Sequence, residues 1–551
     1  MSLALRYNYC MCESKIIQKN YTFSKSGYQL KLPLEFNPII PENDSVRLIS
    51  QFVEEMDLTE LYQTYDKIRK SSVAPKTLLK IVIYAAMNRL YSSRDIERAC
   101  KRDINFMYLL EGSKAPDHAT IARFKSIHFS ECSENLLTQM SEILFDCGEI
   151  SGKNIFIDGT KIESCANKYT FVWKKAVIKS NARLEIKAAT FVEDCEELFG
   201  IRVVADNTVS LHTLKRLRKK LYKLKDDEGI EFVYGTGKRK SELQKCIEQL
   251  EEYISKFKEY INKIHTCGER NSYSKTDPDA TFMRMKEDAM LNGQLKPAYN
   301  LQHGVDSEYI VWLTIGPQQK DTTTLIPFMK SMETHLSFKY ENIVADAGYE
   351  SEENYIFLES NGQRAFIKPT NYEQSKTRKY RNDIGRYENM KYCSEGDFYI
   401  CHNERYLRPF DIKRSRTKTG YVRTTTAYKC DDCSGCPYKA ECIKGNNCHT
   451  AFEDRNKRLD ISKVFIAKRQ ESRERIMSEE GCMLRMNRSI QAEGSFSETK
   501  DGMGFRRYMS RGKKNVLAES IIVAMARNMN KLHAKIQSGR TGMHLYPLKS
   551  A

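Results

Sequence analysis

Apolar residues recur at helical spacing through the first part of the chain. One apolar face follows Pro75 and consists of Leu78, Leu79, Val82, Ile83, Ala86, Met87 and Leu90. Ser93 is placed to cap a second helix, and Asp117 is placed to cap a third. We therefore predict a helical domain over 46–150, preceded by an irregular lead-in over 1–45.

Two short apolar runs each lead into an acid with a glycine close behind it. Residues 154–160 read Asn-Ile-Phe-Ile-Asp-Gly-Thr, and residues 342–348 read Asn-Ile-Val-Ala-Asp-Ala-Gly. Each run predicts a buried strand whose last residue, Asp158 or Asp346, emerges at the sheet edge. Further strands are predicted at 299–306, 309–315 and 365–367, and helices at 323–336 and 352–360. Strands flanked by helices indicate an α/β layer.

The region between these strands is helical and highly charged. Apolar residues at spacings of three and four are Leu211, Leu214, Leu217, Leu221, Leu224, Leu243, Ile247, Leu250, Ile254, Phe257 and Ile261. They predict a long helical hairpin, broken near Gly235, whose stripe serves packing and not cofactor binding. We place this helical insertion at 175–290 and a polar, cysteine-bearing insertion at 371–460. The chain is helical again from about 461 to 536 and ends in a tail over 537–551.

Composition and apolar run length exclude two classes of protein. At 40% hydrophobic and 10% aromatic residues, the 551-residue chain is too apolar to be disordered. Its longest apolar runs, such as 81–87 and 521–526, fall far short of the roughly 20 residues that cross a bilayer. Residues 1–8 lack the pattern of a signal peptide, and the 17 cysteines are an odd number and mostly scattered. These features predict a cytoplasmic protein with reduced thiols and no membrane partner.

Charge suggests a polyanionic partner. Lysine plus arginine number 89 against 72 aspartate plus glutamate, which gives a net charge of +17. The helical domain carries basic residues that could contact phosphates: Lys101, Arg102, Arg123 and Lys125. The alternative is that they form an ordinary solvated surface. A later cluster consists of Arg506, Arg507, Arg511, Lys513 and Lys514, with Phe505 and Tyr508 interleaved. Basic residues that contact phosphates, next to an aromatic residue that stacks on a displaced base, fit a site that binds DNA ends. The alternative is a solvated loop.

A third acid lies in a helical segment near the C-terminus. Glu493 follows Ile490 by three residues and Met486 by seven, so the three share one apolar helical face. A carboxylate aimed at the core needs a partner or a metal ion, unless it is an ordinary surface residue. With Asp158 and Asp346 it completes a set of oxygen ligands for Mg²⁺ or Mn²⁺. Two such ions can promote phosphodiester cleavage.

The acids lie in strings that resemble a known family. The strings at 157–160, 344–349 and 488–500 resemble the three catalytic motifs of bacterial insertion-sequence DDE transposases. Residues 74–124 are similar to the N-terminal domain of the same enzymes, and 276–280 and 299–302 match as well. The resemblance spans the chain from about 60 to 535 and joins several motifs in the family's order.

This resemblance implies an α+β or α/β multidomain fold. Its catalytic domain, over 151–536, would be an RNase H-like mixed sheet flanked by helices and interrupted by the two insertions. Asp158, Asp346 and Glu493 would be the catalytic triad and the ligands of two Mg²⁺ or Mn²⁺ ions.

The resemblance also implies DNA contacts. Lys500 would lie near the strand that is cut, because an ammonium group can hold a phosphate. The other predicted DNA-binding residues are Arg488, Arg506, Arg507 and Arg511. One position departs from the pattern: some branches carry an arginine four residues before the glutamate, whereas here that position is Ser489 and Arg488 stands five residues ahead.

Most cysteines lie singly along the chain, but four of them lie close together in the sequence. They are Cys430, Cys433, Cys436 and Cys442. Their spacing allows tetrahedral coordination of a structural Zn²⁺, with Cys448 and His449 as substitutes for one ligand. An iron–sulfur cluster and chance clustering are the alternatives.

The function that these patterns predict is a DNA transposase. It would bind the terminal inverted repeats of an insertion sequence, cleave and join strands with divalent metal ions, and pair two double-stranded ends as a homodimer on the nucleoid. The alternatives are an RNase H-like nuclease without strand transfer and a catalytically inactive, transposase-derived DNA-binding protein. DNA affinity should fall steeply with salt concentration.

Overall fold

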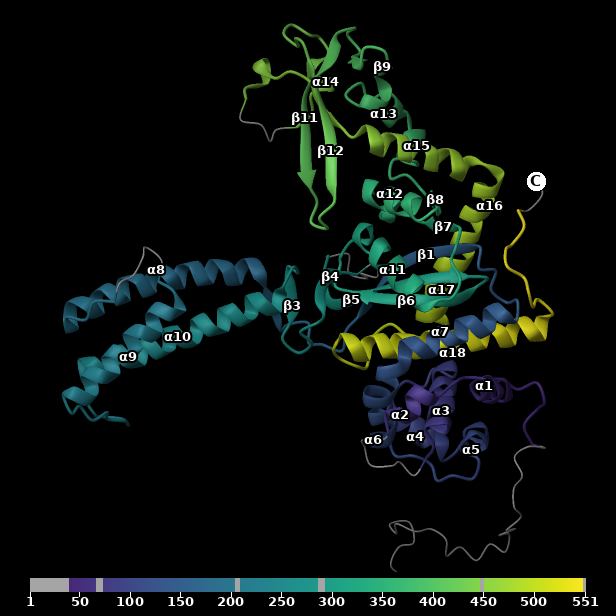
Figure 1. The fold of residues 1–551 in the computed structure, drawn as a ribbon, viewed down its shortest axis with the longest axis horizontal. Helices are drawn as coiled ribbons and strands as arrows, with labels where there is room; N and C mark the ends of the chain where they lie inside the picture. The colour runs from purple at the N-terminus through teal and green to yellow at the C-terminus, as the bar shows by residue number, and fades with distance from the viewer. Residues whose placement is uncertain (1–38, 66–72, 204–208, 286–292, 446–449, 549–551) are drawn as a thin grey trace, which may run out of the picture.

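The computed structural model describes residues 39–65, 73–203, 209–285, 293–445 and 450–548, so the predicted lead-in over 1–45 falls almost entirely outside it. The described chain is a mixed α/β protein with a mixed central sheet and many helices, which confirms the predicted class (Figure 1). Across these segments, no helix combines the length and the apolar character needed to cross a membrane.

Helices make up the first part of the chain. They are α1 (Ser45–Glu54), α2 (Thr59–Gln63), α3 (Pro75–Met87), α4 (Ser93–Cys100), α5 (Ile104–Leu110), α6 (His118–Arg123), the π-helical η1 (Phe124–Phe129) and α7 (Ser130–Asp146). Nearly every side chain of α3 is buried. Asp117 caps α6 by accepting a hydrogen bond from the Thr120 amide, as predicted. The prediction for α4 was wrong by one residue, because Ser92 precedes the helix and Ser93 begins it.

The central sheet has six strands. They are β1 (Asn154–Glu163), β4 (Thr281–Arg284), β5 (Leu295–Asp306), β6 (Tyr309–Gly316), β7 (Asn342–Ala345) and β8 (Arg364–Ile367). Their order is β4-β5-β1-β7-β8, and β6 also pairs with β5. β1 is antiparallel to β5 but parallel to β7, and β7 is parallel to β8. The predicted hairpin of β5 and β6 is confirmed.

One prediction about β1 was wrong. The strand does not end at Asp158 but continues to Glu163. The reason is that β5 pairs with β1 from Phe156 to Glu163. The antiparallel pairing with β5 therefore continues beyond Ile157, where the parallel pairing with β7 stops. Asp158 therefore lies within a central strand, at the point where one neighbour ends.

Helices cover this sheet and connect it to the first helices. α18 (Lys513–Ser538) contacts α3, α7 and β6, and in Figure 1 it runs between the sheet and the N-terminal helices. The other flanking helices are α11 (Leu325–His335), α12 (Glu352–Ser360), α15 (Lys463–Met477) and α16 (Glu479–Arg488). α15 packs on β8, and α16 contacts both β7 and β8. A single apolar core joins the helical region and the sheet.

A helical arm projects from this body (Figure 1). It contains α8 (Lys174–Phe199), α9 (Leu211–Asp227) and α10 (Glu242–Cys267), and β2 (Phe171–Trp173) pairs with β3 (Ser272–Ser274) at its base. The predicted helical hairpin with a break near Gly235 is present as α9 and α10, which pack together, and α8 packs along α10 as a third helix. The predicted stripe does pack: Leu214, Leu217 and Leu221 belong to a core that the arm forms by itself.

The cysteine-bearing segment forms a second, five-stranded sheet. Its strands are β9 (Lys391–Cys393), β10 (Phe398–Ile400), β11 (Tyr406–Arg416), β12 (Val422–Cys430) and β13 (Arg458–Ile461), in the order β13-β12-β11-β10-β9. Short helices accompany it: η4 (Gln374–Lys376), α13 (Arg378–Arg381), η5 (Tyr387–Asn389), α14 (Lys439–Cys442) and η6 (Phe452–Asp454). β11 and β12 form a long hairpin whose outer residues are largely exposed.

Candidate functional site

Two of the predicted acids lie side by side at neighbouring parallel strands, Asp158 within β1 and Asp346 directly after β7. The register aligns Ile157 of β1 with Ala345 of β7, so Asp158 and Asp346 are the next residues on each side. The Asp158 carboxylate accepts a hydrogen bond of 2.8 Å from the Gly159 amide. The Asp346 side chain is 47% exposed, so this edge of the sheet is open to solvent. Parallel pairing therefore brings together two residues that are distant in sequence.

Arg488 connects the third acid to this pair. Its guanidinium lies 2.7 Å from the Glu493 carboxylate and 4.0 Å from that of Asp346. The hydroxyl of Ser489 donates a second hydrogen bond, of 3.2 Å, to Glu493. One cation thus contacts two of the three acids, where it offsets the mutual repulsion of their charges.

The spacing between Arg488 and Glu493 has a structural reason. The residues after α16 form a π-helical turn, η7 (Ser489–Glu493), followed by α17 (Gly494–Ser497) and a second π-helical turn, η8 (Glu498–Gly502). A π-helix hydrogen-bonds residues five apart, so an arginine five residues ahead faces the glutamate. The π-helical turn therefore compensates for the position of the arginine, which stands five residues before the glutamate instead of four.

The predicted orientation of Glu493 was wrong. Its side chain is 53% exposed, and Ile490, which was expected to share an apolar face with it, is 40% exposed. The π-helical turn changes the periodicity on which the prediction depended, and the buried residues of the turn are Gln491 and Ala492. Glu493 consequently faces the open edge of the sheet near Asp346 and not the core.

A buried histidine supports the helix that carries Glu493. His303 of β5 lies directly opposite Asp158 in the ladder, and η7 contacts both strands. Its ring stacks on Phe496 at 4.2 Å between centroids, and its Nδ1 lies 3.2 Å from the Ser495 hydroxyl. Burial, together with the nearby positive charge of Arg527, holds the pKa of His303 well below its ordinary value. The imidazole is therefore neutral and serves packing.

A fourth carboxylate, which the sequence did not single out, lies beside the two strand acids. Asp321 begins the 3₁₀-helix η2 (Asp321–Thr323). Its Oδ1 accepts hydrogen bonds from the side-chain amides of Asn300, at 2.8 Å, and Gln302, at 3.2 Å. A Cβ added at Gly159 would overlap Nε2 of Gln302 and lie 2.9 Å from the same Asp321 oxygen, so a larger residue there would have to displace both side chains. Glycine after Asp158 therefore leaves this hydrogen-bond network undisturbed.

The network around Asp321 reaches the second strand acid. Tyr349, in the 3₁₀-helix η3 (Ala347–Tyr349), donates a hydrogen bond to the Gln302 carbonyl oxygen. Burial raises the pKa of Tyr349 well above its ordinary value, and the charges of Asp321, Asp158 and Asp346 add to the effect. The sequence marked 299–302 as a family-like string, but the pairing of Gln302 with Tyr349 depends on tertiary structure.

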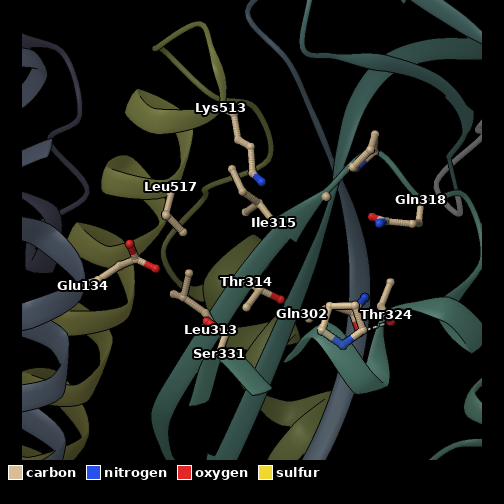
Figure 2. A pocket seen from close by; sticks show the side chains of 13 residues that line it. Glu134, Gln302, Leu313, Thr314, Ile315, Gln318, Thr324, Ser331, Lys513 and Leu517 are labelled. Carbon is tan, nitrogen blue, oxygen red and sulfur yellow. Dashed lines mark hydrogen bonds between the residues drawn. The ribbon is translucent and has the colours of Figure 1, made fainter. Parts of the chain in front are cut away.

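A cavity of about 250 Å³ lies on the other side of this network (Figure 2). Gln302 and Thr324 line it, together with the end of β6, and the Thr324 hydroxyl donates to Gln302 at 3.1 Å. Lys513 of α18 and Glu134 of α7 complete its rim. Gln302 therefore separates the cavity from the carboxylates.

Metal ligation has limited support from this arrangement. Among the described residues, no group of three or more His, Cys, Asp or Glu side chains is arranged to hold a metal ion. The chemistry of the three acids nevertheless fits a hard divalent cation, because all are carboxylates near one sheet edge. Arg488 shows that this edge stabilises positive charge.

The predicted DNA-binding arginines have partners within the protein. Arg506 forms an ion pair with Asp501, Arg507 lies 3.9 Å from Glu163, and Arg511 donates to the Cys165 carbonyl at 2.7 Å. Lys500, in η8, is partly buried and also has an interaction within the chain. Arg507 and Arg511 thereby hold the segment that follows β1.

Two expectations about DNA contact were wrong. Phe505 and Tyr508 are buried and pack against each other, so neither is available to stack on a base. Lys125 is only partly exposed: its ammonium donates to the Tyr91 carbonyl at 2.9 Å, and burial lowers its pKa to about 8. The sequence suggested exposure because these residues lie in polar strings, whereas tertiary packing covers them.

The cysteine cluster is gathered but not arranged as a metal site. Cys430 and Cys433 are buried in the core of the second sheet, with Cys401 and Cys442 packed at its edge. Cys436 lies on the turn after Cys433 and is partly buried. The described part of the chain holds no metal-binding group here, and the substitute ligands Cys448 and His449 lie outside it. Zinc, like an iron–sulfur cluster, stays a prediction without structural support.

The fold and site together define a mixed α/β protein with acids at two adjacent strands and a third on a helix. Comparison with known families finds two matches: residues 400–533 match the transposase DDE domain, and residues 34–126 match the transposase domain DUF772. These matches indicate an insertion-sequence DDE transposase. No curated protein and no solved structure matches the chain.

Proposed function

We propose that this protein binds the terminal inverted repeats of an insertion sequence and catalyses metal-dependent cleavage and transfer of DNA strands. The observation that supports this most directly is the position of the three acids. Asp158 and Asp346 lie at neighbouring strands, and Arg488 brings Glu493 to Asp346. The transposase DDE match contains Glu493, and the DUF772 match covers the N-terminal helices from α1 to α6.

We propose further that the catalytic domain has the RNase H-like layout. In support, β1 lies in the middle of a mixed sheet, with the antiparallel strand β5 on one side and the parallel strands β7 and β8 on the other. The arm would be an insertion between the first two acids, and the second sheet an insertion between the last two.

In this proposal, Asp158, Asp346 and Glu493 hold Mg²⁺ or Mn²⁺. The bound ions would activate a water or a 3′-hydroxyl and stabilise the leaving oxygen. The protein's own groups position these acids: Arg488 and Ser489 fix the Glu493 carboxylate, and His303 supports the helix beneath it. Asp321 adds negative charge beside the strand acids and is itself fixed by two amides.

The proposed partners are double-stranded transposon ends and target DNA. Two ends must be joined in one reaction, so we propose a homodimer in the synaptic complex, acting in the cytoplasm on the nucleoid. Among the residues proposed to touch DNA, Arg488 and Lys500 lie on the helix that carries Glu493. Arg506, Arg507 and Arg511 follow it and would exchange their protein partners for phosphates.

The central test is Asp346→Asn, which removes one carboxylate charge with almost no change in shape. We expect cleavage of a duplex carrying the transposon end to fall by at least 100-fold in Mg²⁺, whereas Asp146→Asn, at an exposed helix end, should cleave as the wild type does. Cleavage by Asp346→Asn at the wild-type rate would refute the assignment of this site.

The same assay separates the alternatives. A transposase joins the cleaved end to a target plasmid, so joined products are expected in addition to nicked ends. Nicked ends without joined products would favour an RNase H-like nuclease. Specific binding of the end duplex with neither product, in Mg²⁺ or in Mn²⁺, would favour an inactive DNA-binding derivative.

A further inference from the structure

The middle helix of the arm carries an unusual arrangement of charge. One side of α9 is apolar, and Leu214, Leu217 and Leu221 are buried against the rest of the arm. The opposite side exposes five basic residues, Lys215, Arg216, Lys219, Lys220 and Lys223. The acids of this helix, Asp226 and Asp227, lie at its C-terminal end. The exposed face is therefore continuously positive over its first three turns.

Most of these charges have no partner in the described chain. Lys220 donates to the Arg202 carbonyl. Lys215, Arg216, Lys219 and Lys223 have neither an ion pair nor a side-chain hydrogen bond to any other described residue. We call these four side chains the α9 basic face.

Three of the four lysines of the neighbouring helix α10 form ion pairs, and the fourth, Lys258, forms none with a described residue. Lys245, Lys256 and Lys263 of α10 pair with glutamates one turn away, and Lys240 just before it pairs with Glu248. The two helices lie in the same arm (Figure 1), and both carry exposed charged residues. Internal pairing is thus available to the arm. On α9 itself Arg218 pairs with Glu251 and Lys225 with Asp226, whereas the α9 basic face has no such partner among the described residues.

The geometry points to duplex DNA as the partner. From Lys215 to Lys223 the helix rises about 12 Å. Duplex DNA carries one phosphate charge per about 1.7 Å of its axis with both strands counted, so a duplex of that length contains about seven phosphates, more than the four basic side chains can contact. An arm with its own core can present this row rigidly, at a distance from the carboxylates (Figure 1).

We propose that the α9 basic face binds the phosphate backbone of duplex DNA outside the cleavage site, without reading its base sequence. This inference rests on the proposed function, because it adds a second DNA contact to the same enzyme. The contact would hold DNA that flanks the cleaved end, or target DNA, while the carboxylates act on the strand itself.

The test replaces four charges on α9 and compares them with four on α10. The first variant carries Lys215→Gln, Arg216→Gln, Lys219→Gln and Lys223→Gln, and the matched control carries Lys240→Gln, Lys245→Gln, Lys256→Gln and Lys263→Gln. Both lose the same net charge. Binding is measured against salt concentration, with a duplex of unrelated sequence as the probe.

We expect the α9 variant to bind this duplex more weakly and to lower the slope of log affinity against log salt by about one to four. The control should keep the wild-type slope, and both variants should unfold at the wild-type temperature. A wild-type slope for the α9 variant, or an equal loss in the control, would overturn the proposal.

A cleavage assay keeps the two proposals apart. On a short duplex that contains only the transposon end, the α9 variant should retain the wild-type rate, because its carboxylates are intact. Normal cleavage by Asp346→Asn would refute the proposed catalytic site. The salt dependence of binding by the α9 variant would still test whether the α9 basic face binds DNA. Loss of short-duplex cleavage in the α9 variant would contradict a role outside the cleavage site.

Discussion

At the scale of single residues, Arg488 shows how local winding can preserve a contact. Glu493 is five positions after it, a spacing that an α-helix would not place on one face, yet the two side chains are 2.7 Å apart. The π-helical turn Ser489–Glu493 accounts for the contact. From the sequence alone the spacing was a departure from the family pattern, because the winding of a helix is not visible in residue identities.

Asp321 gives the prediction at this scale. Replacing it with Asn keeps the hydrogen bonds from Asn300 and Gln302 but removes a negative charge beside Gly159. We expect Asp321→Asn to cleave end DNA about tenfold more slowly and to need more Mg²⁺ for half-maximal rate, as for residues that orient ligands. Cleavage measured across Mg²⁺ concentrations checks this.

Asp411→Asn, on the exposed strand β11, is the control and should behave as the wild type does. A slower rate with an unchanged Mg²⁺ requirement would mean that Asp321 affects the fold of the site and not its ligand chemistry. A wild-type rate would remove Asp321 from the site altogether.

At the scale of elements, the sheet and the helix behind the site are held together by a histidine. His303 of β5 stacks on Phe496 of α17 and lies within hydrogen-bond distance of Ser495. A protonated imidazole would be a buried charge beside Arg527, which is why its pKa is lowered. The packing of these two elements therefore depends on a neutral ring.

This dependence predicts a loss of stability in acid. The unfolded chain protonates His303 below its ordinary pKa of about 6.5, whereas the folded chain does not. Its contribution to stability is fully present above about pH 6.5 and falls as the pH drops, by up to about 1.4 kcal/mol per pH unit. Urea unfolding between about pH 5 and pH 8 measures this slope.

The comparison is with His303→Gln. This variant should be less stable than the wild type at neutral pH, and its free energy of unfolding should fall less steeply as the pH drops. His212→Gln, at an exposed position on α9, should keep the wild-type slope. Parallel profiles for the wild type and His303→Gln would show that this histidine is not kept neutral by the fold.

At the scale of the whole molecule, the C-terminal helix joins parts that are distant in sequence. Arg527 of α18 is buried, pairs with Glu498 of η8 at 2.9 Å and donates to the Glu308 carbonyl at 2.6 Å. It therefore connects the turn between β5 and β6 with the helix that carries Glu493. Because α18 also packs against α3, it links the N-terminal helices to the site.

Arg527→Met should destabilise the protein by about 3 kcal/mol, because it removes the nearer of the two cations that pair with Glu498 and leaves the Glu308 carbonyl without its donor. Urea unfolding at neutral pH measures the change. Arg540→Met, at an exposed position beyond the same helix, should change stability by less than about 0.5 kcal/mol. Equal effects of the two substitutions would contradict the linking role of Arg527.

Much of this protein follows from its sequence. Apolar periodicity located α3, β7, α11, α12 and the hairpin of β5 and β6, because burial of one face imposes a local pattern. The acid-and-glycine strings marked Asp158 and Asp346, and the resemblance to DDE transposases agrees with both family matches. These features are local, so they can be read from neighbouring residues.

Other features were decided by tertiary structure. β1 runs past Asp158 because β5 continues to pair with it, and Glu493 faces the sheet edge because a π-helical turn rotates it there. Burial of Phe505 and Tyr508 depends on neighbours that are distant in the chain, such as Tyr91 and Ser520. Which side chains meet, and which are covered, is set by contacts between distant segments, and residue types and spacing along the chain do not encode those contacts locally.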